Sequence, residues 1–157
     1  MREAKFYYKN YNAPKPNKPN HIGACIIIKH DGKILLEKRK DSNRWALVGG
    51  GLKVDESLER CIIREVNEET GLKINENELK FFKIYSDPSR IAEYPDDNIL
   101  RIITVCYFTE IDKKIDLICS KESEELKFFS FKELKSLNIA ETHKHIILDW
   151  LEKNWEI

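Results

Sequence analysis

Short apolar runs separated by polar turns dominate the pattern of hydrophobic and polar positions along this chain. Ile22–Lys29 is a continuous apolar run, which is typical of a strand covered on both faces. Asp31–Gly32 is a strong hairpin signal, and Ile34–Arg39 then predicts the returning strand. Further strands are predicted over Trp45–Val48, Leu79–Ser86, Ile99–Glu110 and Leu126–Phe131.

Three helices are predicted from apolar residues that recur every three or four positions. The first opens at Asp55–Ser57 and ends at Gly71, with Leu58, Cys61, Ile62 and Val66 as its buried stripe. A short helix over Phe131–Leu137 and an amphipathic helix over Glu141–Asn154 close the chain. His143 and His145 on the last helix are expected to be surface residues. Strands interspersed with helices indicate an α/β protein with a mixed sheet between helices.

Three segments fit neither pattern. Asp87–Asn98 is a polar loop with two prolines, and a loop of this length is often functional. Asp112–Glu125 is charged and predicted to be a loop. Residues 1–20 form an arm that mixes aromatic, basic and proline residues, ahead of a single domain over residues 21–157. We expect the arm to pack on the domain or on a second subunit in a homodimer, and contact with nucleic acid is the alternative.

Composition and charge narrow the class of partner. A chain of 157 residues with 41% hydrophobic content can build one sizeable core. The 27 basic and 27 acidic residues cancel, so no global field gathers nucleic acid or a membrane surface. Attraction of a phosphate-bearing substrate must therefore be local.

The four cysteines form no C-x-x-C pair, and three of them fall within apolar runs, which predicts reduced thiols in a cytoplasmic protein. The first ten residues lack the apolar segment of a signal peptide, and the longest apolar run, Ala24–Ile28, is too short to span a membrane.

The candidate chemistry is concentrated in Gly50–Leu72, which reads GGLKVDESLERCIIREVNEETGL. Glu65, Glu68 and Glu69 share one face of the predicted helix, where like charges repel unless a cation is bound. Carboxylate oxygens are the ligands that Mg²⁺ prefers, and Arg64 beside them can hydrogen-bond a carboxylate to hold it in place.

This run resembles the Nudix box, in which a glycine, four glutamates, an arginine, a second glycine and two aliphatic residues stand at fixed spacing. All nine fixed positions match. The resemblance implies an α/β/α sandwich and a hydrolase that cleaves the pyrophosphate linkage of a nucleoside diphosphate joined to another moiety. One departure is Val48, where family members usually carry proline, and it concerns the geometry of the turn rather than the chemistry.

The resemblance also assigns a metal site. Mg²⁺, for which Mn²⁺ can substitute, would be held by Glu65, Glu68, Glu69 and a carbonyl of the glycine turn, by position that of Gly49. Glu56 would act with Arg64 to orient these groups.

A carboxylate must also take a proton from the attacking water. Glu65 is one candidate for this base. A glutamate of the late loop is the other, as a base or a further metal ligand, and the sequence leaves three alternatives open there: Glu122, Glu124 and Glu125.

The substrate is less well defined. Arg90 is a candidate contact for a phosphate or ribose, Tyr94 for stacking on a base, and Arg44, in a basic cluster before the box, for phosphates. Pro88, sixteen residues past Leu72, resembles a marker of ADP-ribose pyrophosphatases. ADP-ribose or a sugar nucleotide is therefore expected first. The alternatives are a (deoxy)nucleoside triphosphate, a non-catalytic nucleotide-binding domain, or an RNA 5′-end.

Overall fold

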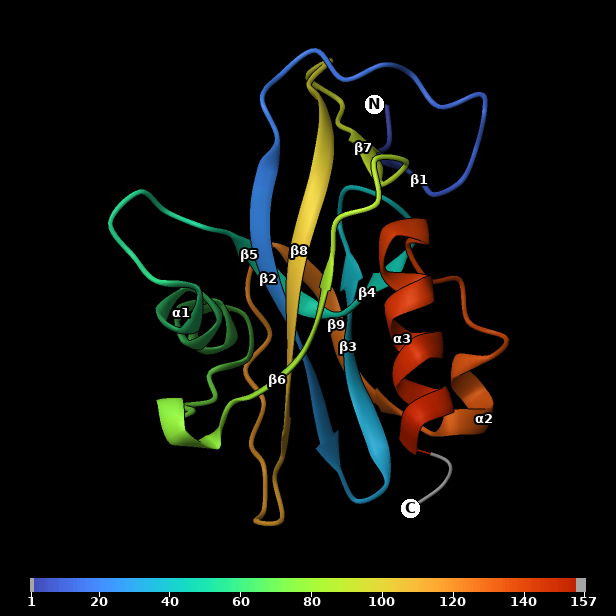
Figure 1. The fold of residues 1–157 in the computed structure, drawn as a ribbon. Helices are drawn as coiled ribbons and strands as arrows, with labels where there is room; N and C mark the ends of the chain where they lie inside the picture. The colour runs from blue at the N-terminus through green and yellow to red at the C-terminus, as the bar shows by residue number, and fades with distance from the viewer. Residues whose placement is uncertain (1, 155–157) are drawn as a thin grey trace.

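A computed structural model gives the structure of the chain and describes residues 2–154. A curled sheet lies between α1 on one side and α2 and α3 on the other (Figure 1). The elements along the chain are β1 Lys5–Tyr7, β2 His21–His30, β3 Lys33–Arg39, β4 Trp45–Ala46, β5 Val48–Gly51, α1 Leu58–Thr70, the 3₁₀ turn Glu76–Glu78, β6 Lys80–Tyr85, β7 Ile91–Glu93, β8 Ile99–Glu110, β9 Ser123–Phe129, α2 Phe131–Leu134 and α3 Glu141–Asn154.

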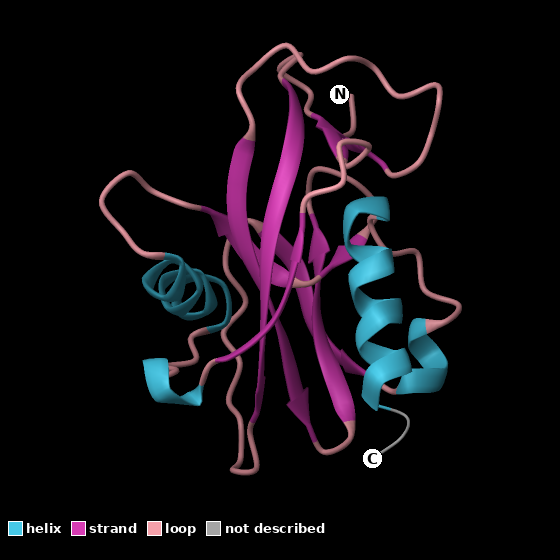
Figure 2. Ribbon diagram, in the orientation of Figure 1, coloured by secondary structure: helices cyan, strands magenta, loops and turns pink. Residues whose placement is uncertain are grey.

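The sheet is mixed and is organised around β2 (Figure 2). β2 runs parallel to β8, from the pair His21 and Ile102 to the pair Lys29 and Glu110. On its other side it pairs antiparallel with β5 and then with β3. The order is β1-β7-β8-β2-β3-β4, with β6 on β8 and β9 on β3. The predicted α/β fold with a mixed sheet between helices is confirmed.

Both faces of β2 are buried, which explains its continuous apolar run. Ala24, Ile26 and Ile28 face α1, in one cluster with Ile62 and Val66. Cys25 and Ile27 face the opposite way, into a cluster with α3 residues that include Ile146 and Trp150. The two helices therefore cover opposite faces of one sheet.

Several elements differ from their predicted extents. The loop after β6 contains the short strand β7, in which Ile91 and Ala92 are buried and pair with β8. β9 begins at Ser123, inside the segment predicted as a loop, and α2 ends at Leu134 rather than Leu137. The strand predicted over Trp45–Val48 is two strands, the second of which continues through the glycines to Gly51.

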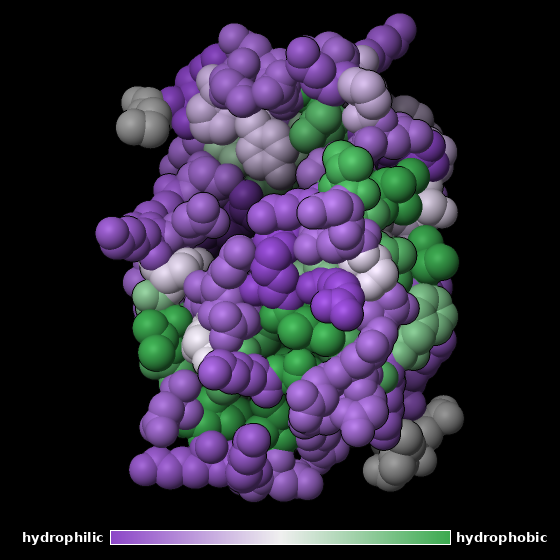
Figure 3. Space-filling model, turned by 90° about the vertical axis from the view of Figure 1, so that its left-hand side faces the viewer, coloured by the Kyte–Doolittle hydropathy of each residue, from purple (hydrophilic) through white to green (hydrophobic). Residues whose placement is uncertain are grey.

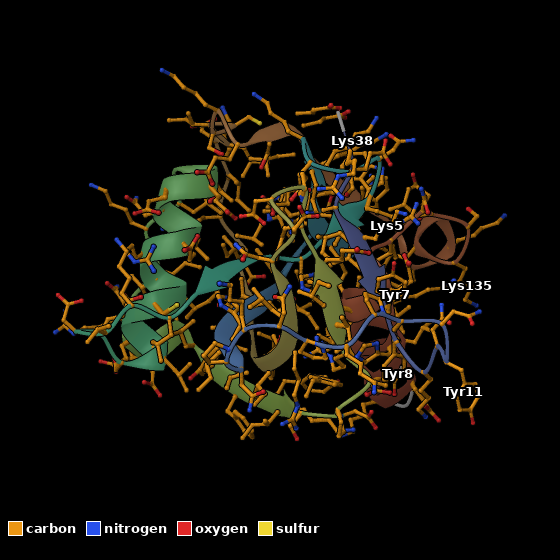
Figure 4. The ribbon with its side chains drawn as sticks, turned by 90° about the horizontal axis from the view of Figure 1, so that it is seen from above. Lys5, Tyr7, Tyr8, Tyr11, Lys38 and Lys135 are labelled. Atoms are coloured by element: carbon orange, nitrogen blue, oxygen red, sulfur yellow. The ribbon has the colours of Figure 1, made fainter. Side chains whose placement is uncertain are left out.

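The N-terminal arm adds a strand to the sheet. β1 pairs antiparallel with β7, Phe6 is buried, and the Ala4 amide donates to the Asp41 carbonyl at 2.7 Å. Tyr8 lies over α3, where its ring stacks on His145 with centroids 3.8 Å apart, whereas Tyr11 points away from the molecule (Figure 4). The arm therefore packs on its own chain through residues 4–8.

The face that carries α1 is mostly hydrophilic, with apolar side chains gathered in its lower half (Figure 3). Among the described residues, no helix is both long enough and apolar enough to cross a membrane.

Candidate active site

Helix α1 is fixed at both ends by residues of the Nudix-like run. The Ser57 hydroxyl accepts a hydrogen bond from the Arg60 amide at 3.2 Å, which caps the N-terminus. Gly71 takes a left-handed conformation with φ of 77°, and its amide donates to the Asn67 carbonyl. These caps set the position of the glutamates relative to the glycine strand β5.

The three glutamates of the cluster on α1 lie in different environments. Glu69 is 8% exposed, Glu65 is mostly buried, and Glu68 keeps 54% of its side chain in solvent. Cys61, Glu65 and Glu69 stand four residues apart, so they form one row beside the core stripe. Glu69 therefore lies beside the buried side of the helix rather than across from it.

Arg64 holds the start of the helix and the loop before it together. Its guanidinium donates to both oxygens of Glu56, at 2.6 and 2.9 Å, and to Glu65 Oε1 at 2.8 Å. It also reaches Glu68 at 3.2 Å and the Gly51 carbonyl at 3.2 Å. The hydrogen bonds from Arg64 lower the pKa of Glu56 to about 2, so this carboxylate stays charged.

Gly50 allows the Glu65 carboxylate to lie against the backbone of β5. A Cβ atom at Gly50 would overlap the carboxylate group of Glu65. Any other residue at this position would therefore displace Glu65.

A cleft of about 510 Å³ opens beside this contact and brings together residues from distant parts of the chain. Five residues expected at the site line it: Gly49, Glu65, Glu69, Tyr94 and Glu122. Of the three late-loop glutamates, Glu122 is thus the one that the fold places at the cleft. Tyr94 forms part of the wall, packed edge-on against Phe6 with ring centroids 6.4 Å apart.

The sequence analysis missed further residues of the cleft. Glu37 and Arg39 from β3 and His21 from the start of β2 also line it, as does Ser123. Glu37 is buried with 6% exposure, and its Oε2 accepts a hydrogen bond from the Ser123 hydroxyl at 2.8 Å. The available signal was a glutamate that directly follows the apolar run Ile34–Leu36 within a predicted strand.

Burial and mutual repulsion weaken the acidity of these carboxyl groups. Desolvation raises the pKa of Glu69 to about 10, and the nearby Glu37 adds to the effect. Desolvation also raises the pKa values of Glu37 and Glu65, although Arg64 opposes the shift at Glu65. The cleft is therefore a place where negative charge is costly unless a cation compensates it.

The donor set fits a hard divalent cation. The Glu69 Oε2 atom is buried and has no hydrogen-bond partner, and carboxylate and carbonyl oxygens suit Mg²⁺ or Mn²⁺. Within residues 2–154, however, no three Asp, Glu, His or Cys side chains are already arranged to hold a metal ion. The two observations agree if water and substrate phosphates complete the coordination of an ion that the carboxylates hold only in part, which is the usual arrangement for Mg²⁺.

The structure places Arg90 away from the cleft, in the interior, with 0% exposure. Its guanidinium donates to the carbonyls of Tyr85 at 3.0 Å, Ile102 at 2.7 Å and Thr142 at 2.7 Å. It also donates to Thr104 Oγ1 at 3.1 Å. Each of its three side-chain nitrogens donates to protein, so Arg90 connects the loop before β7 with β6, β8 and α3, and it does not line the cleft.

Other predicted contacts also lie elsewhere. Arg44 pairs with Glu141 at 3.0 Å and joins the loop before β4 to α3. Glu124 and Glu125 are exposed on β9, where Glu124 approaches Lys38 at 3.8 Å. Glu68 does not line the cleft in this structure but remains within reach of Arg64.

The two histidines of α3 are half-buried rather than on the surface. The Leu47 amide donates to His143 Nδ1 at 3.0 Å, and the Arg90 Nε group donates to His145 Nε2 at 3.0 Å. Each imidazole therefore accepts a hydrogen bond and is neutral. Desolvation, aided by Arg90, lowers the pKa of His143 to about 3 and that of His145 to about 4.

Comparison with known proteins identifies the family. Residues 19–150 match the NUDIX domain family. The chain belongs to the Nudix family.

Named relatives of this Nudix protein act on nucleotides. An ADP-ribose pyrophosphatase of Methanocaldococcus jannaschii is 32% identical over 128 residues, covering 80% of this chain and 69% of that protein. A nucleoside triphosphatase NudI of an Enterobacter species is 26% identical over 123 residues, covering 74% of this chain and 86% of that protein. A MutT-like protein of Streptomyces ambofaciens is 41% identical over 56 residues, which is 36% of either chain.

Solved Nudix structures share the fold. A bifunctional NMN adenylyltransferase/ADP ribose pyrophosphatase from Francisella tularensis, complexed with AMP and a manganese ion, aligns with a TM-score of 0.68 and 26% identity. The alignment covers 88% of this chain but 43% of that protein, so this chain corresponds to only part of it. The family and these relatives identify this Nudix protein as a hydrolase of phosphoanhydride bonds, and Nudix hydrolases use divalent metal ions.

Proposed function

We propose that this chain is a Mg²⁺-dependent pyrophosphohydrolase whose preferred substrate is ADP-ribose or another nucleoside diphosphate sugar. One observation carries the proposal. Glu65 and Glu69 are buried at a cleft, and one carboxylate oxygen of Glu69 has no partner in the protein. Carboxylates in this state suit a cation that also binds the phosphates of a substrate.

The chain's own residues would hold this arrangement in place. A divalent cation, when bound, neutralises phosphate charge and orients the attacking water and the scissile bond in line. Glu69, Glu65 and the Gly49 carbonyl would hold it, with Glu68 near the opening of the site. Arg64 keeps Glu65 directed toward β5 through the 2.8 Å hydrogen bond.

The proton acceptor is proposed to be Glu65 or Glu122. Glu65 lies at the cleft but is engaged by Arg64, whereas Glu122 is exposed at the rim. Replacement of the base by glutamine should lower kcat and remove the acidic limb of the pH–rate profile. The pH–rate profiles of Glu65→Gln and Glu122→Gln should therefore be compared. If a variant keeps the acidic limb, the residue that it replaces is not the base.

The substrate assignment is supported by the relatives and by the cleft wall. The M. jannaschii protein and the F. tularensis structure are both named for ADP-ribose pyrophosphatase activity. Tyr94, packed on Phe6, offers an aromatic face at the cleft for a nucleobase. A (deoxy)nucleoside triphosphate is the second candidate, because the NudI relatives are named for that activity.

The remaining parts of the proposal concern setting and partners. Cys25, Cys61 and Cys106 are buried free thiols, which accords with a reducing compartment such as the cytoplasm. A homodimer stays a prediction. RNA is disfavoured as a partner because the net charge is zero and β1 and Tyr8 of the arm pack on the chain's own sheet and α3.

The test is hydrolysis by purified protein with Mg²⁺ or Mn²⁺ over ADP-ribose, sugar nucleotides and (d)NTPs, with product analysis. Release of AMP and a sugar phosphate from ADP-ribose, at a higher kcat/KM than for any (d)NTP, would support the proposal. A preference for (d)NTPs would replace the substrate assignment, and no turnover on any substrate would favour a non-catalytic nucleotide-binding domain.

A further inference from the structure

Glu37 is a buried carboxylate outside the Nudix box that none of the roles above uses. It stands on β3, lines the cleft together with Glu65 and Glu69, and is 6% exposed. It approaches Glu69 closely enough for the two carboxyl groups to influence each other's protonation. A second buried acid facing Glu69 needs a physical reason, because like charges in an apolar setting repel strongly.

The two arginines near the cleft are already engaged by other acids, and the further cationic lining residue, Lys40, is exposed. Arg64 donates to Glu56, Glu65 and Glu68. Arg39 forms a bidentate pair with Asp41, at 2.6 and 2.7 Å, and affects Glu37 only at longer range. Among the described residues, neither Glu37 nor Glu69 forms an ion pair. The protein therefore supplies two buried acids with which no cationic side chain of residues 2–154 forms an ion pair.

The orientation of Glu37 is fixed. The Ser123 hydroxyl, itself buried, donates to Glu37 Oε2 at 2.8 Å. Ser123 follows Glu122 in the chain, and its backbone stands opposite Arg39 in the β3–β9 pairing. The β3–β9 pairing thus brings Glu37 and the Glu122–Ser123 segment to the same cleft, which Glu69 lines from α1.

We propose that Glu37 is an additional anionic residue of the divalent-cation site, facing the ion from β3 while Glu69 faces it from α1. The inference rests on the proposed function, because it assumes that a cation occupies this cleft. The site would then extend beyond the Nudix box to β3, which carries Glu37, and to the start of β9, where Ser123 positions it. The competing explanation is that Glu37 and Glu69 share a proton as a purely structural pair.

The test measures cation binding rather than turnover. Wild type, Glu37→Gln and the charge-matched control Glu152→Gln, which alters an exposed residue of α3, are titrated with Mn²⁺ without nucleotide and followed by electron paramagnetic resonance. We expect the Kd for Mn²⁺ to rise at least tenfold in Glu37→Gln and to stay unchanged in Glu152→Gln. The melting temperature of metal-free Glu37→Gln should equal or exceed that of wild type, because a buried like charge is removed.

A second variant guards against misfolding of the first. Ser123→Ala retains both acids but releases Glu37, and should weaken Mn²⁺ binding about threefold. Unchanged Mn²⁺ affinity in Glu37→Gln and Ser123→Ala would overturn the inference, as would failure of the wild type to bind Mn²⁺. If wild type binds Mn²⁺ and Glu37→Gln does not, yet no nucleotide is hydrolysed, the inference holds and the proposed function fails.

Discussion

Glu69 shows how one residue can be unfavourable for the fold and useful for the chemistry. It is buried, carries an unpartnered oxygen and lies near two other acids. A residue that served only stability would be replaced at this position by an apolar side chain of similar size. In the proposed function, a bound cation would offset the cost of keeping this carboxylate.

Glu69→Gln is therefore expected to lower kcat by about 100-fold or more, because the carboxylate that is proposed to hold the cation is lost, and the cation stabilises the charge of the transition state. The metal-free melting temperature should not fall, since the substitution removes a buried carboxyl group with no cationic partner. Steady-state kinetics with Mg²⁺ and thermal unfolding of the same preparations measure both effects. Near-normal Mg²⁺-dependent turnover would contradict the metal assignment.

Arg90, unlike Glu69, has hydrogen-bond partners in the protein, and its contribution is therefore expected to be to stability. Arg90→Leu should reduce the free energy of unfolding by about 3 kcal/mol, because buried carbonyls and Thr104 lose their donor. Arg44→Leu, at an exposed ion pair, should cost less than about 1 kcal/mol. Chemical denaturation checks the difference. An Arg90→Leu protein that is as stable as wild type but has a raised KM would instead indicate that Arg90 contributes to substrate binding.

His145 adds a pH dependence to stability. Its folded pKa of about 4 lies below its usual value near 6.5 because burial and Arg90 disfavour the imidazolium. The unfolded state then binds more protons between these values, so stability contributed by His145 is complete above pH 6.5 and declines as pH falls toward 4. The groups around the ring are Tyr8, Tyr85, Arg90, Asp87 and Asp149, with the Glu141 carbonyl on Nδ1.

The measurement is the free energy of unfolding of wild type and His145→Gln at pH values from 8 to 5. Glutamine can accept the Arg90 hydrogen bond but does not titrate. Wild type should lose up to about 1.4 kcal/mol per pH unit more than His145→Gln below pH 6.5. Parallel curves for the two proteins would contradict the neutral, buried state of His145.

At the scale of elements, β1 joins the arm to the wall of the cleft. Phe6 is buried, packs on Tyr94 and lies under the Arg39 guanidinium, 4.8 Å from its ring centroid. Phe6→Ala should reduce the free energy of unfolding by about 3 kcal/mol and raise KM, because Tyr94 and Arg39 both lose support. Tyr11→Ala, in the same arm but fully exposed, should change neither. Equal KM values for wild type, Phe6→Ala and Tyr11→Ala would show that the arm does not contribute to substrate binding.

The elements that the sequence predicted well have a strong local signal. The caps at Ser57 and Gly71 and the 3.6-residue period defined α1, and the Asp31–Gly32 hairpin is formed with positive φ at both residues. β1 and β7 have only three residues each, and they form because β7 pairs with β8 and β1 then pairs with β7, which no local pattern reveals. Residues 5–7 and 91–93 are strands because of tertiary contacts rather than local sequence.

At the scale of the whole molecule, the sequence identified the residues of the box but not their partners across the cleft. Glu65 and Glu69 are predicted from their spacing and from the resemblance to the Nudix box. Glu37, His21 and Arg39 reach the same cleft only because β2 and β3 fold beside α1. Arg90 was misassigned because an arginine in a polar loop has the same sequence context whether it faces solvent or the interior. Long-range topology, rather than residue type, separates these cases.

The most direct test of the central claim is the hydrolysis of ADP-ribose by wild type and by Glu69→Gln at saturating Mg²⁺, with the products separated chromatographically. We predict equal amounts of AMP and ribose 5-phosphate from wild type and a rate lower by about 100-fold or more from Glu69→Gln. Wild-type protein that releases no AMP with either Mg²⁺ or Mn²⁺, or a Glu69→Gln variant that releases it at the wild-type rate, would contradict the account.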